Sequence, residues 1–375
     1  MLIDLHNDAI PRLVMNGNAN LAERNSHGAT DLVRLREGGV HVQTFVMFCN
    51  GQYQGEEAYA YAVAMMDRFD QLMATAPQRV EQARRVSDIP TIVASGRIAA
   101  LLAVEGGHML ADSPDKLESF HRRGVMYLTL TWNNSTNWAT SAYDETTDRV
   151  GRGKRGLSPL GKDILARMNG LGVVADLSHA GEQTFYDVIK ATTKPVMATH
   201  SNAYALVPHY RNLKDEQLSA IAENDGLVGV NFYAGFVDAG YRDRFSSLIQ
   251  LHPDLTDALG REQLVQGNVD VRMKFLDALP PQEMQWLLPD LDRLLDHIDY
   301  LVEKTGIDHV AIGSDFDGAE AYPKGINDVT AYPLLLDGLR KRGYTSGMLA
   351  KFTGSNALRV LAGQRPVNRH NTIKQ

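Results

Sequence analysis

The chain has 375 residues, of which 44% are hydrophobic and 22% charged, with 38 basic against 45 acidic side chains and a formal net charge of -7. This length can bury one barrel-sized core or two smaller ones, and an acidic balance without a sustained basic stripe argues against nucleic acid as a partner. Cys49 is the only cysteine, so no intrachain disulfide can form.

No apolar run approaches the ~20 residues of a membrane-spanning helix. No basic segment followed by an apolar run precedes the first apolar segment at residues 2–5. We therefore expect no membrane span and take the cytoplasm as the default location. A periplasmic or secreted location is the alternative if a signal peptide has been removed.

Short β-rich segments alternate with longer helical patterns, which is typical of a parallel sheet built from βα units. Good start and stop signals accompany one helix, which Ser158 opens and Gly170 and Gly172 close. The predicted helices include residues 159–168, 215–222, 288–302 and 332–342. The eight predicted strands are residues 2–5, 40–48, 98–104, 125–131, 173–177, 196–199, 227–232 and 310–313. Eight such units favour a closed (β/α)8 barrel of the TIM type, forming a single domain over residues 1–375.

Two connections are longer than the ~2 to 6 residues usual after a strand in such folds. Residues 132–156 follow the fourth strand and include the polar, glycine-rich stretch 149–155, and residues 233–286 follow the seventh. Both leave strand ends where a barrel enzyme places its catalytic groups. We expect 233–286 to be an insertion over the site and both connections to roof it. A solvated loop with surface helices is the alternative.

Groups that bind metal or move protons follow several of these strands. His6 and Asp8 lie two apart, so their side chains leave the same side of a strand and can chelate one ion. A capping Asp beside a hydrogen-bonded His explains the same triplet. Glu105 emerges from an apolar strand before two glycines, where burial requires a partner such as a metal ion. Its alternative role is to cap the next helix.

Two histidines end consecutive predicted strands, His179 after residues 173–177 and His200 after 196–199. Consecutive strands are usually neighbours in a barrel. Each histidine alone is also explained by a satisfied core position. Asp315 follows the last strand, and Asp317 belongs to a turn that needs no further explanation. Asp315 is therefore the better candidate for proton transfer.

The alternative explanations, capping and buried structural roles, would have to hold at five separate strand ends. One functional site explains all five. Two ions ~3.5 to 4 Å apart need a bridging carboxylate, flanking imidazoles and open positions for water, and this set of residues supplies them. Mixed nitrogen and oxygen ligands suit zinc better than magnesium or calcium. The sequence therefore predicts a centre of two zinc ions.

The motifs in this order resemble the membrane dipeptidase (renal dipeptidase) family, zinc peptidases among the amidohydrolase-like barrels. The resemblance covers nearly the whole chain, and its order and spacing make it specific. It rests on residues 6–8, 31–39, 104–108, 156–161, 176–179, 199–203, 211–212 and 313–318.

The resemblance implies that His6, Asp8 and Glu105 hold one zinc ion and that Glu105, His179 and His200 hold the second. It implies that the aspartate at position 315 handles the proton of the bridging water. It also implies that Arg211 engages the terminal carboxylate of the substrate. Asn212 is a candidate support for that contact.

One departure from the family is plain at Trp132, where renal-type members carry a histidine thought to polarise the scissile carbonyl. Indole donates one hydrogen bond through its N–H but cannot take up a proton and pass it on. Asn133 or the zinc ions are alternatives for that role, and we count Trp132 and Asn133 among the candidate substrate contacts.

The activity implied is hydrolysis of dipeptides, with a D residue tolerated at the carboxyl end and a homodimer as a common family assembly. Two alternatives remain open at this level. One is an amide or lactone hydrolase on the same metal centre, which Trp132 favours. The other is a metal- or ligand-binding barrel without turnover.

Overall fold

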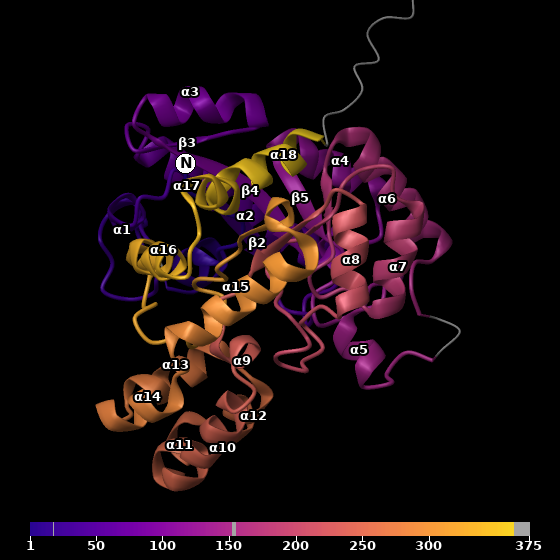
Figure 1. Ribbon diagram of the computed structural model, residues 1–375. Helices are drawn as coiled ribbons and strands as arrows, with labels where there is room; N and C mark the ends of the chain where they lie inside the picture. Colours follow the sequence, from indigo (N-terminus) through magenta and orange to yellow (C-terminus); the bar gives the residue numbers. More distant parts are fainter. Residues whose placement is uncertain (18, 152–154, 364–375) are drawn as a thin grey trace, which may run out of the picture.

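The computed structural model describes residues 1–17, 19–151 and 155–363, and it forms a parallel β-barrel surrounded by helices (Figure 1). Neighbouring strands around the barrel follow the order β1-β2-β4-β5-β6-β7-β8-β9. Their bounds are β1 Ile3–Asp4, β2 Val42–Phe48, β4 Ile98–Glu105, β5 Val125–Thr129, β6 Val174–Asp176, β7 Met197–Ala198, β8 Leu227–Val230 and β9 Val310–Ile312. The last strand meets the first, because the Leu5 amide donates to the Ile312 carbonyl at 3.0 Å. The predicted (β/α)8 barrel is confirmed.

A ninth strand, β3 (Val80–Gln82), was not predicted. It pairs in parallel with the start of β4, with Val80 opposite Ile98, and lies off the ring. Three residues are too short to show an alternating pattern in the sequence. The eight predicted strands all exist, although most are shorter than expected because strand ends turn away toward the site.

The four helices predicted by residue range are present as α6 (Pro159–Leu171), α8 (Asp215–Glu223), α15 (Leu291–Thr305) and α16 (Tyr332–Lys341). The hydroxyl of Ser158 accepts the Gly161 amide and caps α6, and Gly172 ends this helix with a left-handed φ of 77°. The other barrel helices are α1 Leu32–Glu37, α2 Gly55–Thr75, α3 Ile89–Ala94, α4 Pro114–Arg123, α5 Ala142–Thr146, α7 Glu182–Ala191, α17 Ser346–Ala350 and α18 Asn356–Gly363. Short π and 3-10 segments are η1 Ile10–Asn16, η2 Val86–Asp88, η3 Gly107–Leu110, η5 Ile307–His309, η6 Val329–Ala331 and η7 Lys351–Ser355.

The barrel has one apolar core inside and another between its strands and the helices. Alternate residues of β4 (Ala99, Leu101 and Ala103) lie in the inner core, and α18 contributes Val360 and Leu361 to it. The same alternation directs Glu105 into the barrel at the carboxyl end of β4. The strands therefore present polar side chains at one end of a barrel whose other end is filled by apolar ones.

Close packing inside the barrel requires glycine in two strands beside the site. A Cβ at Gly229 would lie 1.9 Å from the Thr199 carbonyl oxygen, and a Cβ at Gly313 would lie 1.7 Å from the same atom. Both contacts are with backbone, which cannot move aside cheaply. These glycines therefore allow the backbones of β7, β8 and β9 to lie close to one another just below the site.

Residues 233–286 form six helices rather than an irregular connection. They are α9 Ala234–Val237, α10 Tyr241–Leu251, α11 Pro253–Leu259, α12 Arg261–Gln266, α13 Val269–Asp277 and α14 Pro281–Leu287. Phe245, Leu248 and Phe275 belong to a core that these helices build for themselves. In Figure 1 the six helices gather at the end of the molecule opposite α3, α17 and α18.

The connection after β5 contains α5, and residues 152–154 of its predicted glycine-rich stretch lie outside the described part. Within the described residues, no helix has both the length and the apolar composition needed to cross a bilayer.

Candidate metal centre

The structure brings the five predicted metal ligands together at the carboxyl ends of four strands. His6 and Asp8 follow β1, Glu105 ends β4, His179 follows β6 and His200 follows β7. All five are buried, with exposed fractions between 0% for His6 and 9% for His179. Segments almost 200 residues apart in the chain thus supply a single cluster.

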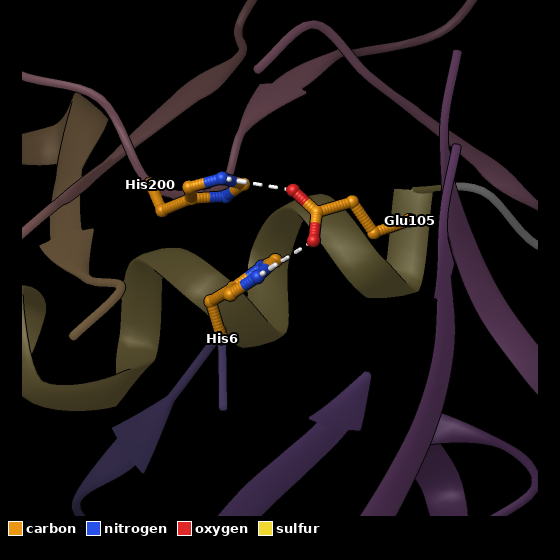
Figure 2. A group of neighbouring side chains, drawn as sticks. All are labelled: His6, Glu105 and His200. Atoms are coloured by element: carbon orange, nitrogen blue, oxygen red, sulfur yellow. Dashed lines mark ion pairs between the residues drawn. The ribbon is translucent and has the colours of Figure 1, made fainter. Parts of the chain in front are cut away.

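Glu105 lies at the centre of this cluster. Its Oε2 atom is 3.5 Å from His6 Nε2, whereas Oε1 is 3.0 Å from His179 Nε2 and 3.2 Å from His200 Nε2. Figure 2 shows the two carboxylate oxygens turned toward different imidazoles, His6 on one side and His200 on the other. One carboxylate therefore faces two separate groups of nitrogen ligands.

Hydrogen bonds fix which nitrogen of two histidines carries the proton. His200 Nδ1 lies 2.9 Å from Thr199 Oγ1, whose own proton goes to Asp176 at 2.7 Å, so Nδ1 must be the donor. His179 Nδ1 lies 3.0 Å from Asn133 Oδ1, an oxygen that only accepts. Both rings therefore direct the lone pair of Nε2 toward Glu105.

Although burial opposes its charge, Glu105 and Asp8 raise the pKa of His6 well above its usual value, so this imidazole holds a proton that a bound metal ion would replace. Burial lowers the pKa of His179 to about 4 and holds that of His200 well below its usual value. Burial opposes ionisation of Glu105, but the charge of His6 and contacts with the three imidazoles hold the pKa of its carboxyl well below the usual range. Neutral imidazole nitrogens and an ionised carboxylate are all acceptors, and a divalent cation between them satisfies each.

A second group of close oxygen and nitrogen atoms comprises His6, Asp8 and Asp315. Their ligand atoms lie within 4.8 Å of one another, as do those of His6, Glu105 and His200. His6 Nε2 is 3.6 Å from Asp8 Oδ2, and neither this nitrogen nor Asp8 Oδ1 has a hydrogen-bond partner. Buried polar atoms without partners are uncommon, and metal coordination accounts for both.

Asp315 lies beside this group and is held by a residue that the sequence did not identify. Asn231, just after β8, donates to Asp315 Oδ2 at 2.9 Å. Burial, followed by the charges of Asp8 and Glu105, raises the pKa of Asp315 to about 8, against the opposing effects of His6 and Asn231. A carboxyl group with a pKa near neutrality can both accept and release a proton.

Two of the predicted site residues have backbone conformations that side chains other than glycine rarely adopt. His179 has a φ of 67° and Asp315 a φ of 62°. Left-handed backbone conformations at non-glycine residues cluster at functional sites. This conformation turns each side chain out of the strand direction and into the cluster. Local sequence patterns do not reveal such a backbone conformation.

The centre opens into a cavity of about 1070 Å³. Asp8, Glu105, His179, His200 and Asp315 line it, together with Arg211. The guanidinium of Arg211 is buried, donates to the His200 carbonyl at 3.1 Å and leaves Nε without a partner. Since burial lowers the pKa of this guanidinium, an anion beside it would be strongly favoured.

The remaining predicted contacts differ in their placement. Trp132 and Asn133 line the cavity, with the Trp132 ring 5.1 Å from Phe48 and 6.3 Å from His179. Asn212 is a departure from the expectation. It does not line the cavity, because its amide nitrogen donates to the carbonyls of Val207 and Phe236 and its side chain is buried. Asn212 therefore positions the loop that carries Arg211.

Several cavity residues were missed by sequence reasoning. Arg149, His209 and Arg242 line the wall beside Arg211. Arg149 lies at the start of the polar stretch expected to roof the site, whereas His209 and Arg242 lie in a loop and on α10, at no strand end. Asn231 could have been found, since it is a polar residue directly after the apolar strand β8.

Comparison with known proteins gives a family match over residues 1–374, to the model described as Membrane dipeptidase (Peptidase family M19). Dipeptidase tcpJ of Claviceps purpurea is 30% identical over 343 residues, which cover 89% of this chain and 69% of that protein. Dipeptidase aclJ of Aspergillus oryzae is 31% identical over 351 residues, covering 92% and 72% respectively.

Solved structures agree with this match. The structure described as dipeptidase AC, a metallo peptidase of family M19, superposes with a TM-score of 0.78 at 27% identity, covering 98% of this chain and 99% of that one. A metallo peptidase from Rhodobacter sphaeroides, liganded with a phosphinate mimic of the dipeptide L-Ala-D-Ala, gives 0.78 at 26% identity, with 97% and 99% covered.

Proposed function

Since this chain belongs to the membrane dipeptidase family of metal-dependent dipeptidases, we propose that it hydrolyses dipeptides at a centre of two zinc ions. The observation that carries the proposal is the placement of Glu105, whose two oxygens face His6 on one side and His179 with His200 on the other. A carboxylate bridge of this kind is what a two-metal hydrolase needs.

In this proposal His6, Asp8 and one oxygen of Glu105 hold the first ion. The other oxygen of Glu105, together with His179 and His200, holds the second. Zinc suits mixed imidazole and carboxylate ligands. When bound, the ions supply Lewis acidity, which lowers the pKa of water from 15.7 to about 7 and polarises the peptide carbonyl.

Asp315 is the proposed proton carrier. It accepts the proton of the attacking water and then gives it to the nitrogen of the scissile bond. The protonated nitrogen can leave as a neutral amine. Asn231 keeps the carboxylate oriented by its hydrogen bond to Oδ2. Asp315 is half-buried and lines the cavity, and Tyr322 donates to its backbone carbonyl at 3.1 Å.

Arg211 is the proposed binding group for the carboxylate of the substrate. Arg211 lines the cavity that also contains the candidate metal ligands, and its buried Nε has no hydrogen-bond partner among the described residues. Guanidinium pairs with a carboxylate through two parallel hydrogen bonds and fixes its orientation. A carboxylate at a fixed distance from the reacting carbonyl selects dipeptides over longer chains.

We further propose that a D residue is accepted at the carboxyl end, because the Rhodobacter sphaeroides relative binds a mimic of L-Ala-D-Ala. Residues 233–286 act as an insertion that covers the site, since Phe236, Tyr241 and Phe245 line the cavity. The alternative of an amide or lactone hydrolase rests on Trp132, which stands where renal-type members have a histidine.

Metal analysis combined with a dipeptidase assay tests the proposal. We expect two zinc ions per chain, loss of dipeptide hydrolysis on chelation and recovery when zinc is returned. Asp8→Asn and His179→Gln should each retain about one ion, because each change removes a ligand from a different site, whereas Glu105→Gln should weaken both. Hydrolysis confined to lactones, or unaffected by chelation, would overturn the proposal.

A further inference from the structure

The cavity wall around Arg211 contains more unpaired positive charge than one substrate carboxylate requires. Among the described residues, no carboxylate lies within ion-pair distance of Arg149, Arg211 or Arg242, and all three line the cavity. The other two cavity arginines are neutralised. Arg12 pairs with Asp270 at 3.1 Å, and Arg272 pairs with Glu320 at 3.0 Å.

Aromatic contacts join these cationic groups into one wall. The Arg149 guanidinium lies over the Tyr143 ring at 4.7 Å, and this ring lies 5.7 Å from that of Tyr210. The Tyr210 ring lies 4.2 Å from His209, which contacts Arg242. Arg149 comes from the loop after α5 and Arg242 from α10, so two remote segments place their charges on the same side of the cavity.

His209 lies between Arg211 and Arg242 in this wall. Its Nδ1 accepts the backbone amide of Arg211 at 3.1 Å. Burial, followed by the charges of Arg242 and Arg211, lowers the pKa of His209 to about 2, so the ring is neutral and carries its one proton on Nε2. That nitrogen faces the Arg242 guanidinium. His209 therefore joins Arg211 and Arg242 in one part of the wall, where an anionic oxygen could accept from the guanidinium of Arg242.

We propose that Arg242, His209 and Arg149 bind a second carboxylate of the substrate, so that the preferred dipeptides end in aspartate or glutamate. The inference rests on the proposed function, in which Arg211 holds the α-carboxylate of the same residue. His209 precedes Arg211 by two positions and is hydrogen-bonded to its amide, so the second anionic group belongs to the side chain of the carboxyl-terminal residue.

The acidic side of the cavity cannot serve this purpose. Of the acids that line the cavity, Asp8, Glu105, Asp315 and Asp317 form no ion pair with an arginine among the described residues, and they lie at or beside the proposed metal centre. A negative side chain there would meet like charges. Only the wall with unpaired arginines offers an anion a favourable environment.

The first test compares isosteric substrates on the zinc-loaded wild-type enzyme. Ala-Asp and Ala-Glu are assayed against Ala-Asn and Ala-Gln, with both L and D configurations at the second residue. We expect kcat/KM to be about 10-fold or more higher for the acidic member of each pair, and this ratio to fall as salt is raised. Equal values for acid and amide would overturn the inference while leaving the proposed dipeptidase intact. Absence of hydrolysis of every dipeptide would instead refute the proposed function.

The second test removes the charges. Arg242→Gln and Arg149→Gln should each lower the ratio of acid to amide kcat/KM by about 5- to 10-fold. Arg68→Gln on the outer surface of α2 is the matched control, because Arg68 bonds only to Gln71 on its own helix. An equal fall for acid and amide substrates would overturn the inference, since the arginines would then act on structure alone. If a variant fails to fold, the wild-type comparison still decides.

Discussion

Replacement of Arg211 by methionine should strongly lower catalytic activity and leave the stability of the fold almost unchanged. The guanidinium is buried, with 4% of the residue exposed, and has no carboxylate partner. A bidentate pair with the substrate carboxylate supplies two charge-assisted hydrogen bonds of about 1.5–3 kcal/mol each. Losing both should cost roughly 3–5 kcal/mol of transition-state binding, which lowers kcat/KM by about two to four orders of magnitude.

Folding should be affected little by the same change. Arg211 donates to the His200 carbonyl at 3.1 Å and to Ser201 Oγ at 3.5 Å, and its Nε has no partner. Loss of these two bonds is offset because a buried cation no longer has to be desolvated. We expect the unfolding free energy of the free enzyme to change by less than about 1 kcal/mol.

Arg34→Met is the matched control, because Arg34 is an equally buried arginine that does have carboxylate partners. Its Nε lies 2.6 Å from Asp31 and its Nη1 lies 3.1 Å from Asp328. Removing it leaves the buried carboxylate of Asp31 and the half-buried one of Asp328 without their arginine, and should cost about 3–5 kcal/mol of stability. Urea unfolding and steady-state assays on both variants measure the contrast. A fall of less than 10-fold in kcat/KM for Arg211→Met, or a stability loss as large as that of Arg34→Met, would refute the reasoning.

Three other changes test separate parts of the structure. Asp315→Asn should lower kcat by at least about 100-fold while metal content stays unchanged, because amide cannot carry the proton; normal turnover would remove Asp315 from that role. Asn133→Leu should weaken metal affinity about 10- to 100-fold in a competition titration with a chelator, because His179 loses the acceptor that orients it; unaltered affinity would contradict this. Burial lowers the pKa of His297 to about 4 from 6.5, so the unfolded state binds more protons between these values and stability falls as pH drops below about 6.5. Unfolding in urea at pH 7 and 5 should differ by roughly 2 kcal/mol more in the wild type than in His297→Gln, and equal differences would exclude this contribution.

Local sequence patterns were sufficient to predict the barrel strands of this protein and the residues at their ends. Apolar runs of the right length located eight strands, and the alternation within β4 directs Glu105 into the barrel. The sequence also predicted which residues follow those strands, because a strand end is a local feature. The carboxyl ends of parallel strands lie at one end of a barrel, so placing the ligands on strand ends was enough to group them.

Tertiary structure alone decided the finer features of the site. His179 and Asp315 reach the centre through left-handed backbone conformations that the barrel imposes, and Asn231 supports Asp315 across neighbouring strands. Arg242 contacts His209 and Arg149 lies over Tyr143 in the same cavity, from segments that share no sequence pattern. Local periodicity reports which face of an element is buried, whereas distances between remote segments depend on how the whole chain packs. For that reason the grouping of the candidate metal ligands could be predicted from sequence, and the cationic wall could not.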